Sequence, residues 1–151
     1  MTRFSAVSLA VLLGVPLAPA AAQQASAPVQ VTTTAVTRVT LFRIVPGQGG
    51  AYNRDIVENL IPIYEEFKKA GLITEYSFFS KTTSESPTDW NAGVSLTYAN
   101  FAGLDNFGPR ANPITLKHYG SAEKRAAALT ARGGMRTAIS SFLTQRLAFN
   151  R

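Results

Sequence analysis

The hydrophobic period of the sequence changes sharply at Pro46-Gly47, and this change constrains the fold more than any other feature. Residues Thr37–Val45 are rich in β-branched and aromatic side chains, which indicates a strand that ends at the Pro-Gly pair. Beyond it, apolar residues recur at three- and four-residue steps from Tyr52 to Phe67, which is one face of an amphipathic helix. The chain therefore begins its fold with a strand followed by a helix.

Two further strands are predicted after this helix, which Gly71 ends as a left-handed C-cap. Alternating apolar side chains predict strands over Leu72–Lys81 and Trp90–Tyr98, joined by the polar segment 82–89. A connection of this kind implies antiparallel pairing. Within the helix, Pro62 lacks a backbone N–H and predicts a kink.

The C-terminal part carries a broken helical region. Asn100 is a good N-cap for a short helix that should stop at Gly108-Pro109. Asn112-Pro113 repeats the start signal, and Gly120 closes that second piece. An alanine-rich third piece follows over Ala122–Arg132.

The end of the chain is ambiguous at residues 135–142, which either extend this helix or end it, and we expect a short last strand over Leu143–Phe149. The element order is then strand, helix, strand, strand, broken helix, strand. This is the order of the ferredoxin-like α+β fold (βαββαβ), in which an antiparallel sheet carries its helices on one face.

The first 22 residues have the layout of a cleaved secretory signal. Arg3 precedes an apolar stretch from Ala6 to Leu17, and Pro19–Ala22 offers an A-x-A cleavage site. That stretch is shorter than the ~20 residues of a membrane-spanning helix, so the mature chain is expected to lack a transmembrane span and to be periplasmic or secreted. We expect a signal peptide at 1–22, a disordered tether at 23–36 and the folded domain at 37–151.

Both faces of the predicted sheet carry large apolar side chains. Alternation places Val39 and Leu41 on one face of the first strand, and Phe42 and Ile44 on the other. The helices of this topology cover one face only, and a monomer rarely leaves a second apolar face in water. We therefore expect a homodimer that forms through the helix-free face of the sheet.

Three segments of the sequence resemble the dimeric α+β barrel superfamily. They are the strand end Phe42–Gly47, the helix with Pro62 ahead of Lys68–Gly71, and Val94–Tyr98 followed by Asn100–Leu104. This superfamily includes antibiotic-biosynthesis monooxygenases, EthD-like proteins and NIPSNAP-like proteins. The resemblance spans residues 36–149 and implies two sheets that form a barrel, with a pocket between each sheet and its own helices. The resemblance determines no activity. Binding of haem or flavin also stays open, because pockets of this superfamily hold cofactors without a sequence motif.

Five residues are candidates for lining such a pocket. His118, the only histidine, is a candidate proton carrier or haem ligand, although a surface position near a helix end is the commoner role. Arg43 stands on the face of Val39, where a buried guanidinium needs an anionic partner, either Glu75 or a ligand anion. Alternatively, Arg43 occupies an edge position where its side chain reaches water. The other three either line the pocket with polar tips or pack in the core: Tyr76, Trp90 and Tyr98.

Composition narrows the chemistry. None of the 151 residues is cysteine, which excludes disulfides, thiolate metal sites and cysteine nucleophiles. The carboxylates of the first helix fall mostly on its predicted solvated face, and no acid/base pair, G-x-S-x-G, H-E-x-x-H or calcium loop is present. A hydrolase or metalloenzyme is therefore disfavoured, and no motif implies a metal or cofactor.

Charge is concentrated at the C-terminal end. Residues 106–151 contain eight Lys or Arg and one acidic residue, which we interpret first as solvated surface charge and second as a contact for lipid or a polyanion. Nucleic acid is not an expected partner, because the basic positions are not interleaved with aromatic residues.

The sequence therefore favours an exported small-molecule-binding protein whose activity it does not determine. Two alternatives stay open. One is a cofactor-free monooxygenase-like or haem-binding enzyme that uses the internal pocket. The other is a non-enzymatic envelope module that contacts a partner through its basic C-terminal surface.

Overall fold

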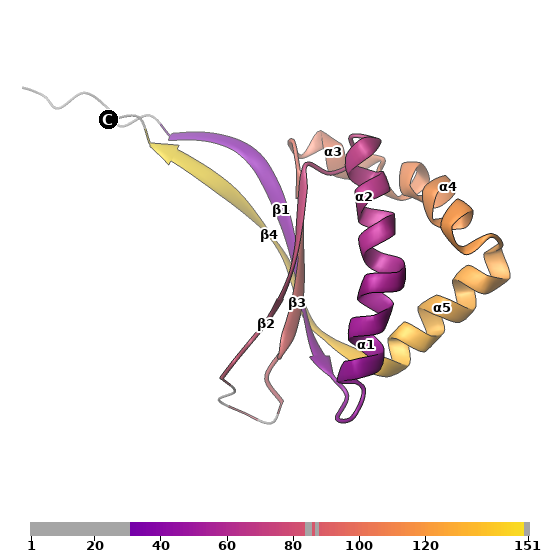
Figure 1. Ribbon diagram of the computed structural model, residues 1–151. Helices are drawn as coiled ribbons and strands as arrows, with labels where there is room; N and C mark the ends of the chain where they lie inside the picture. The colour runs from indigo at the N-terminus through magenta and orange to yellow at the C-terminus, as the bar shows by residue number, and fades with distance from the viewer. Residues whose placement is uncertain (1–30, 84–85, 87, 150–151) are drawn as a thin grey trace, which may run out of the picture.

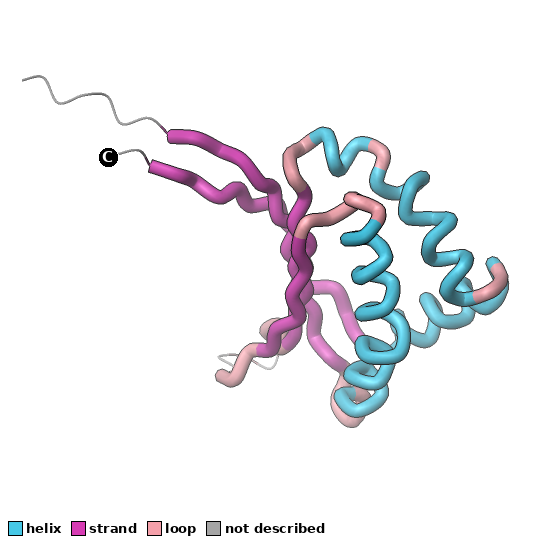
Figure 2. Tube along the Cα trace, turned by 45° about the horizontal axis from the view of Figure 1, so that its top comes forward, coloured by secondary structure: helices cyan, strands magenta, loops and turns pink. Residues whose placement is uncertain are grey.

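One antiparallel sheet of four strands organises the chain (Figure 1). The structure is a computed structural model that describes residues 31–83, 86 and 88–149, so the predicted signal peptide lies outside the described residues. The strands lie in the order β2-β3-β1-β4, with bounds β1 Val31–Ile44, β2 Glu75–Ser80, β3 Ala92–Tyr98 and β4 Arg136–Phe149. The described helices lie on one side of the sheet (Figure 2). This is the predicted ferredoxin-like α+β fold.

The first crossover is one long helix with a wider turn at its centre. It comprises α1 (Gly49–Asp55), the π-helical turn η1 (Ile56–Leu60) and α2 (Ile61–Lys69). At the wide turn, the Ile61 N–H donates to the Ile56 carbonyl, five residues back. Pro62 follows directly and has no N–H to donate, so the predicted irregularity takes the form of a π turn.

The second crossover contains α3 (Ala102–Asp105), α4 (Phe107–Tyr119) and α5 (Ala122–Met135). The predicted stop at Gly108-Pro109 is wrong, because α4 runs through it and through Asn112-Pro113. Pro109 falls in the first helical turn, where backbone N–H groups have no partner within the helix and a proline sacrifices no hydrogen bond. Gly120 ends α4 in the left-handed conformation, as predicted.

Two neighbouring strands, the central β1 and the edge strand β4, are both longer than the local pattern predicts. Within the ambiguous range 135–142, only Met135 belongs to α5, which ends there. β4 begins at Arg136, seven residues before the predicted Leu143. β1 begins at Val31, so residues 31–36, which we expected in the tether, pair with β4. Long-range pairing along the length of both strands produces this extension. The paired ends form an arm that projects beyond the helices (Figure 1).

The two faces of the sheet differ as side-chain alternation predicts. Phe42 is buried on the helix side, and Val39 and Leu41 lie on the open side. The open side is also partly polar, since the hydroxyls of Thr37 and Thr97 lie 2.9 Å apart there. The main core packs between α2, α4 and β3, and its members are Ile63, Phe67, Leu72, Ile73, Tyr98 and Ala111. Among the described helices, none has the length and apolar character needed to cross a membrane.

Candidate functional site

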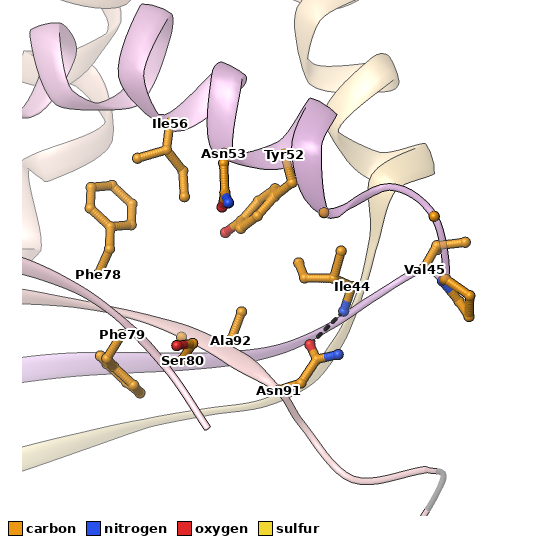
Figure 3. A pocket seen from close by; sticks show the side chains of 14 residues that line it. Ile44, Val45, Tyr52, Asn53, Ile56, Phe78, Phe79, Ser80, Asn91 and Ala92 are labelled. Carbon is orange, nitrogen blue, oxygen red and sulfur yellow. Dashed lines mark hydrogen bonds between the residues drawn. The ribbon is translucent and has the colours of Figure 1, made fainter. Parts of the chain in front are cut away.

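A cleft of about 510 Å³ lies between α1 and the sheet, beside the turn that follows β1 (Figure 3). Its apolar wall combines one helix residue with residues of three strands: Ile44, Ile56, Phe78 and Ala92. Two polar side chains of α1, Tyr52 and Asn53, point into the space between these walls. An apolar cleft with a few convergent polar groups is the usual form of a small-molecule site.

The Tyr52 hydroxyl is held by a cation behind the cleft. Arg136, the first residue of β4, donates from Nη1 to the Tyr52 oxygen over 3.1 Å. Its guanidinium lies 3.8 Å from the centre of the Phe42 ring, and it forms no ion pair with a carboxylate of the described residues. Accepting a hydrogen bond from a cation strengthens Tyr52 as a donor in turn.

The hydroxyl proton of Tyr52 has no acceptor within the described part of the chain. Tyr52 itself is only 3% exposed, so water has little access to compete for this proton. A ligand oxygen in the cleft is its natural acceptor. The arrangement thus offers a charge-assisted hydroxyl donor at the inner end of a largely apolar cleft.

A buried ion pair joins α1 to α5 on the same side of the sheet. Asp55 and Arg132 are 9% and 6% exposed, and two hydrogen bonds connect them, from Nε to Oδ2 at 2.5 Å and from Nη2 to Oδ1 at 3.0 Å. Arg132 Nη2 also donates to the Tyr119 hydroxyl, and Asn59 Nδ2 donates to Asp55 Oδ1. Burial opposes the charge of Arg132, but its bonds to Asp55 and Tyr119 outweigh that effect and raise the pKa of the guanidinium.

A smaller cavity of about 200 Å³ adjoins this ion pair between α2, α4, α5 and β3. Tyr64 lines it and stacks on Phe67 and Phe78 at ring-centre distances of 5.8 and 5.7 Å. Burial raises the pKa of Tyr64 to about 12, although Arg136 and Arg132 act in the opposite direction. Tyr64 is therefore a neutral wall of the interior at physiological pH.

Two of the five predicted site residues lie on the helix side of the sheet. The Tyr76 hydroxyl donates to Glu65 Oε1 over 2.6 Å. Tyr98 is fully buried, and its hydroxyl is the one buried side-chain polar atom of the described residues without a hydrogen-bond partner. Arg38 lies over the Tyr98 ring at 5.8 Å. Neither tyrosine lines the cleft beside α1.

Arg43 and Trp90 lie away from these tyrosines, on the open side of the sheet. Arg43 Nη1 donates to the main-chain oxygen of Asp89 over 3.0 Å, so its partner is not Glu75. The Trp90 ring stands edge-on to Phe79, with ring centres 6.0 Å apart. The structure therefore does not bring these two residues together with Tyr76 and Tyr98 in one cavity.

His118, the fifth predicted residue, lies in a separate groove between α2 and α4. Its Nε2 is 3.0 Å from Asn59 Oδ1. Across residues 31–83, 86 and 88–149, no group of three or more His, Asp or Glu side chains is placed to hold a metal ion.

Sequence reasoning missed the charged members of the interior. Asp55 was expected among the solvated carboxylates, and Arg132 and Arg136 among the solvated basic charges, but all three turn inward. The spacing of Tyr52, Asp55 and Asn59 at three and four residues was the available signal, because it places Asp55 on the inner face of its helix. No local signal identifies the two arginines, which meet α1 from 77 and 84 residues away.

Comparisons with known proteins support the fold. Models of known protein families give no match to the sequence, and neither do curated proteins. Among solved structures, the chain is similar to HapK from Hahella chejuensis, with a TM-score of 0.50 and 9% identity over 74% of this chain and 91% of that one. At this identity the likeness is one of fold.

Two other solved structures are similar over comparable shares of the chain. One is a dimeric protein of unknown function with a ferredoxin-like fold from Bacteroides fragilis, with 12% identity, a TM-score of 0.45, and coverage of 74% of this chain and 96% of that one. The other is an EthD family protein from Bacillus halodurans, with 8% identity, a TM-score of 0.44, and coverage of 75% and 98%. The strand order of the sheet and the likeness to HapK show a ferredoxin-like α+β protein, and the predicted resemblance holds at the level of the fold.

Proposed function

We propose that the protein binds a small, largely apolar ligand carrying a carbonyl or carboxylate oxygen, in the cleft between α1 and the sheet. The observation that carries this proposal is the Tyr52 hydroxyl, which accepts from Arg136 and keeps its own proton for an acceptor in the cleft. The second donor is the side-chain amide of Asn53, which points into the same space (Figure 3).

Size and charge agree with this ligand class. A volume of about 510 Å³ suits a ligand of one or two rings, and the four apolar wall residues would contact its body. Arg136 lacks a carboxylate partner among the described residues, so a ligand anion would supply the missing charge behind Tyr52. The same donor would stabilise an oxyanion, which is what the enzymatic alternative requires.

Calorimetric titration with 1-naphthoate tests the proposal. We expect Tyr52→Phe to weaken binding by about 10-fold or more, because it removes one hydrogen bond to a charged group. Tyr76→Phe is the matched control, since it removes a hydroxyl outside the cleft. Equal affinity of the wild type and Tyr52→Phe would refute the assignment of Tyr52.

We also propose that the protein is an exported homodimer that assembles through the open side of the sheet and β4. Five of its large exposed apolar residues lie on β4, from 44% to 61% exposed: Ile139, Phe142, Leu143, Leu147 and Phe149. A second copy would remove this surface from water. The basic envelope module is less well supported, because Arg132 and Arg136 are turned inward.

A further inference from the structure

A groove of about 610 Å³ lies between α2 and α4 and shares no lining residue with the cleft beside α1. Four apolar residues from the two helices line it: Pro62, Ile63, Pro113 and Ile114. Charged residues and His118 complete the lining. The groove has the volume and the mixture of apolar and polar groups that a small-molecule site requires.

A chain of hydrogen bonds fixes which ring nitrogen of His118 carries a proton. Both carboxylate oxygens of Asp55 accept hydrogen bonds from Arg132, so Asn59 directs its amide N–H to Asp55 Oδ1, at 2.9 Å. The amide oxygen of Asn59 is then left to accept from His118 Nε2, at 3.0 Å. His118 is therefore protonated at Nε2.

It follows that Nδ1 of neutral His118 is a hydrogen-bond acceptor. No hydrogen bond to Nδ1 exists within the described residues, and the His118 ring lines the groove. The ring is further held edge-on by Tyr119, with ring centres 4.9 Å apart. The groove therefore presents an oriented, neutral acceptor whose complement is a ligand O–H.

The charges around the groove balance one another. Lys69 Nζ pairs with Glu66 Oε1 at 2.6 Å, and Glu65 accepts from the Tyr76 hydroxyl. With Lys117, the lining holds two acidic and two basic side chains. A groove without net charge favours a neutral ligand over an ionic one.

We propose that this groove binds neutral phenols, with the phenol O–H donating to His118 Nδ1 and the ring lying on the apolar lining. The site is independent of the cleft proposed above, because the two share no lining residue. His118 acts as the recognition group, and Asn59 as the residue that positions it through Asp55 and Arg132.

Nitrogen-15 NMR of the single imidazole tests the first step on the unmodified protein. At about pH 9, above the range in which a histidine ordinarily takes up a proton, we expect the tautomer with hydrogen on Nε2. A tautomer with hydrogen on Nδ1 would overturn the proposal, because the groove would then present a donor.

Binding of 2-naphthol and of its methyl ether, 2-methoxynaphthalene, tests the second step. The ether has the same rings but no O–H, so we expect the wild type to prefer 2-naphthol by about 5- to 10-fold, the effect of one hydrogen bond. His118→Phe keeps a ring and should abolish this preference, whereas Tyr52→Phe should retain it. No preference in the wild type, or an unchanged preference in His118→Phe, would overturn the proposal. Loss of the preference in Tyr52→Phe would assign the phenol to the cleft instead and likewise refute the groove.

Discussion

Removal of Arg132 should destabilise the protein more than any change to a surface charge. Arg132→Met keeps an unbranched, flexible side chain but leaves the Asp55 carboxylate, 9% exposed, with only the Asn59 amide as a partner among the described residues. Breaking a buried ion pair from one side costs about 3–5 kcal/mol, because an uncompensated charge stays buried. For a domain of this size that loss corresponds to a fall in melting temperature of about 10–20 °C.

Denaturant unfolding at neutral pH measures this effect, and two further variants isolate its cause. Arg125→Met makes the same change on the same helix, where the partners of Arg125 among the described residues are Asn112 and Thr115, and it should cost no more than about 1 kcal/mol. The double variant Asp55→Leu/Arg132→Met removes both charges and should recover most of the lost free energy. A loss below about 1 kcal/mol for Arg132→Met would refute the reasoning, as would a double variant no more stable than the single one.

Three further perturbations test other parts of the structure. Burial raises the pKa of Tyr64 to about 12, so above about pH 10 the folded state keeps a proton that the unfolded state loses. The free energy of unfolding should therefore decline between about pH 10 and pH 12. In unfolding experiments, Tyr64→Phe should make the decline of the unfolding free energy with pH shallower by up to about 1.4 kcal/mol per pH unit. An unchanged slope would contradict the raised pKa of Tyr64. Light scattering at micromolar concentration should give a dimer for the wild type and a folded monomer for Phe142→Glu, whereas a wild-type monomer would count against the proposed interface. Mass spectrometry of the protein from its producing cell should find a chain beginning at or near Gln23, and an intact Met1 or Thr2 terminus would argue against export.

Local signals were sufficient to predict much of the fold. The Pro46-Gly47 turn, the amphipathic spacing after it and the hairpin gave the correct element order, because each depends on residues close together in the sequence. Gly71 and Gly120 adopt positive φ angles of 64° and 81°, as expected of C-cap glycines. Ser121 accepts from the Lys124 N–H and caps α5, which is the usual role of a serine just before a helix.

The errors arose where distant partners decide the structure. β4 extends back to Arg136 because it pairs there with Ile44 of β1, and the local sequence gives no sign of that partner. The interior site was missed for the same reason. Arg132 and Arg136 look like surface residues in isolation, since charged side chains are rarely buried without a partner, and their partners Asp55 and Tyr52 lie on the first helix.

A crystal structure of the protein with 1-naphthoate tests the central proposal most directly. We expect the naphthalene rings between Ile56 and Phe78, and one carboxylate oxygen within about 3.2 Å of the Tyr52 hydroxyl. Naphthoate found outside this cleft, or within it but with its carboxylate turned away from Tyr52, would contradict the proposed function.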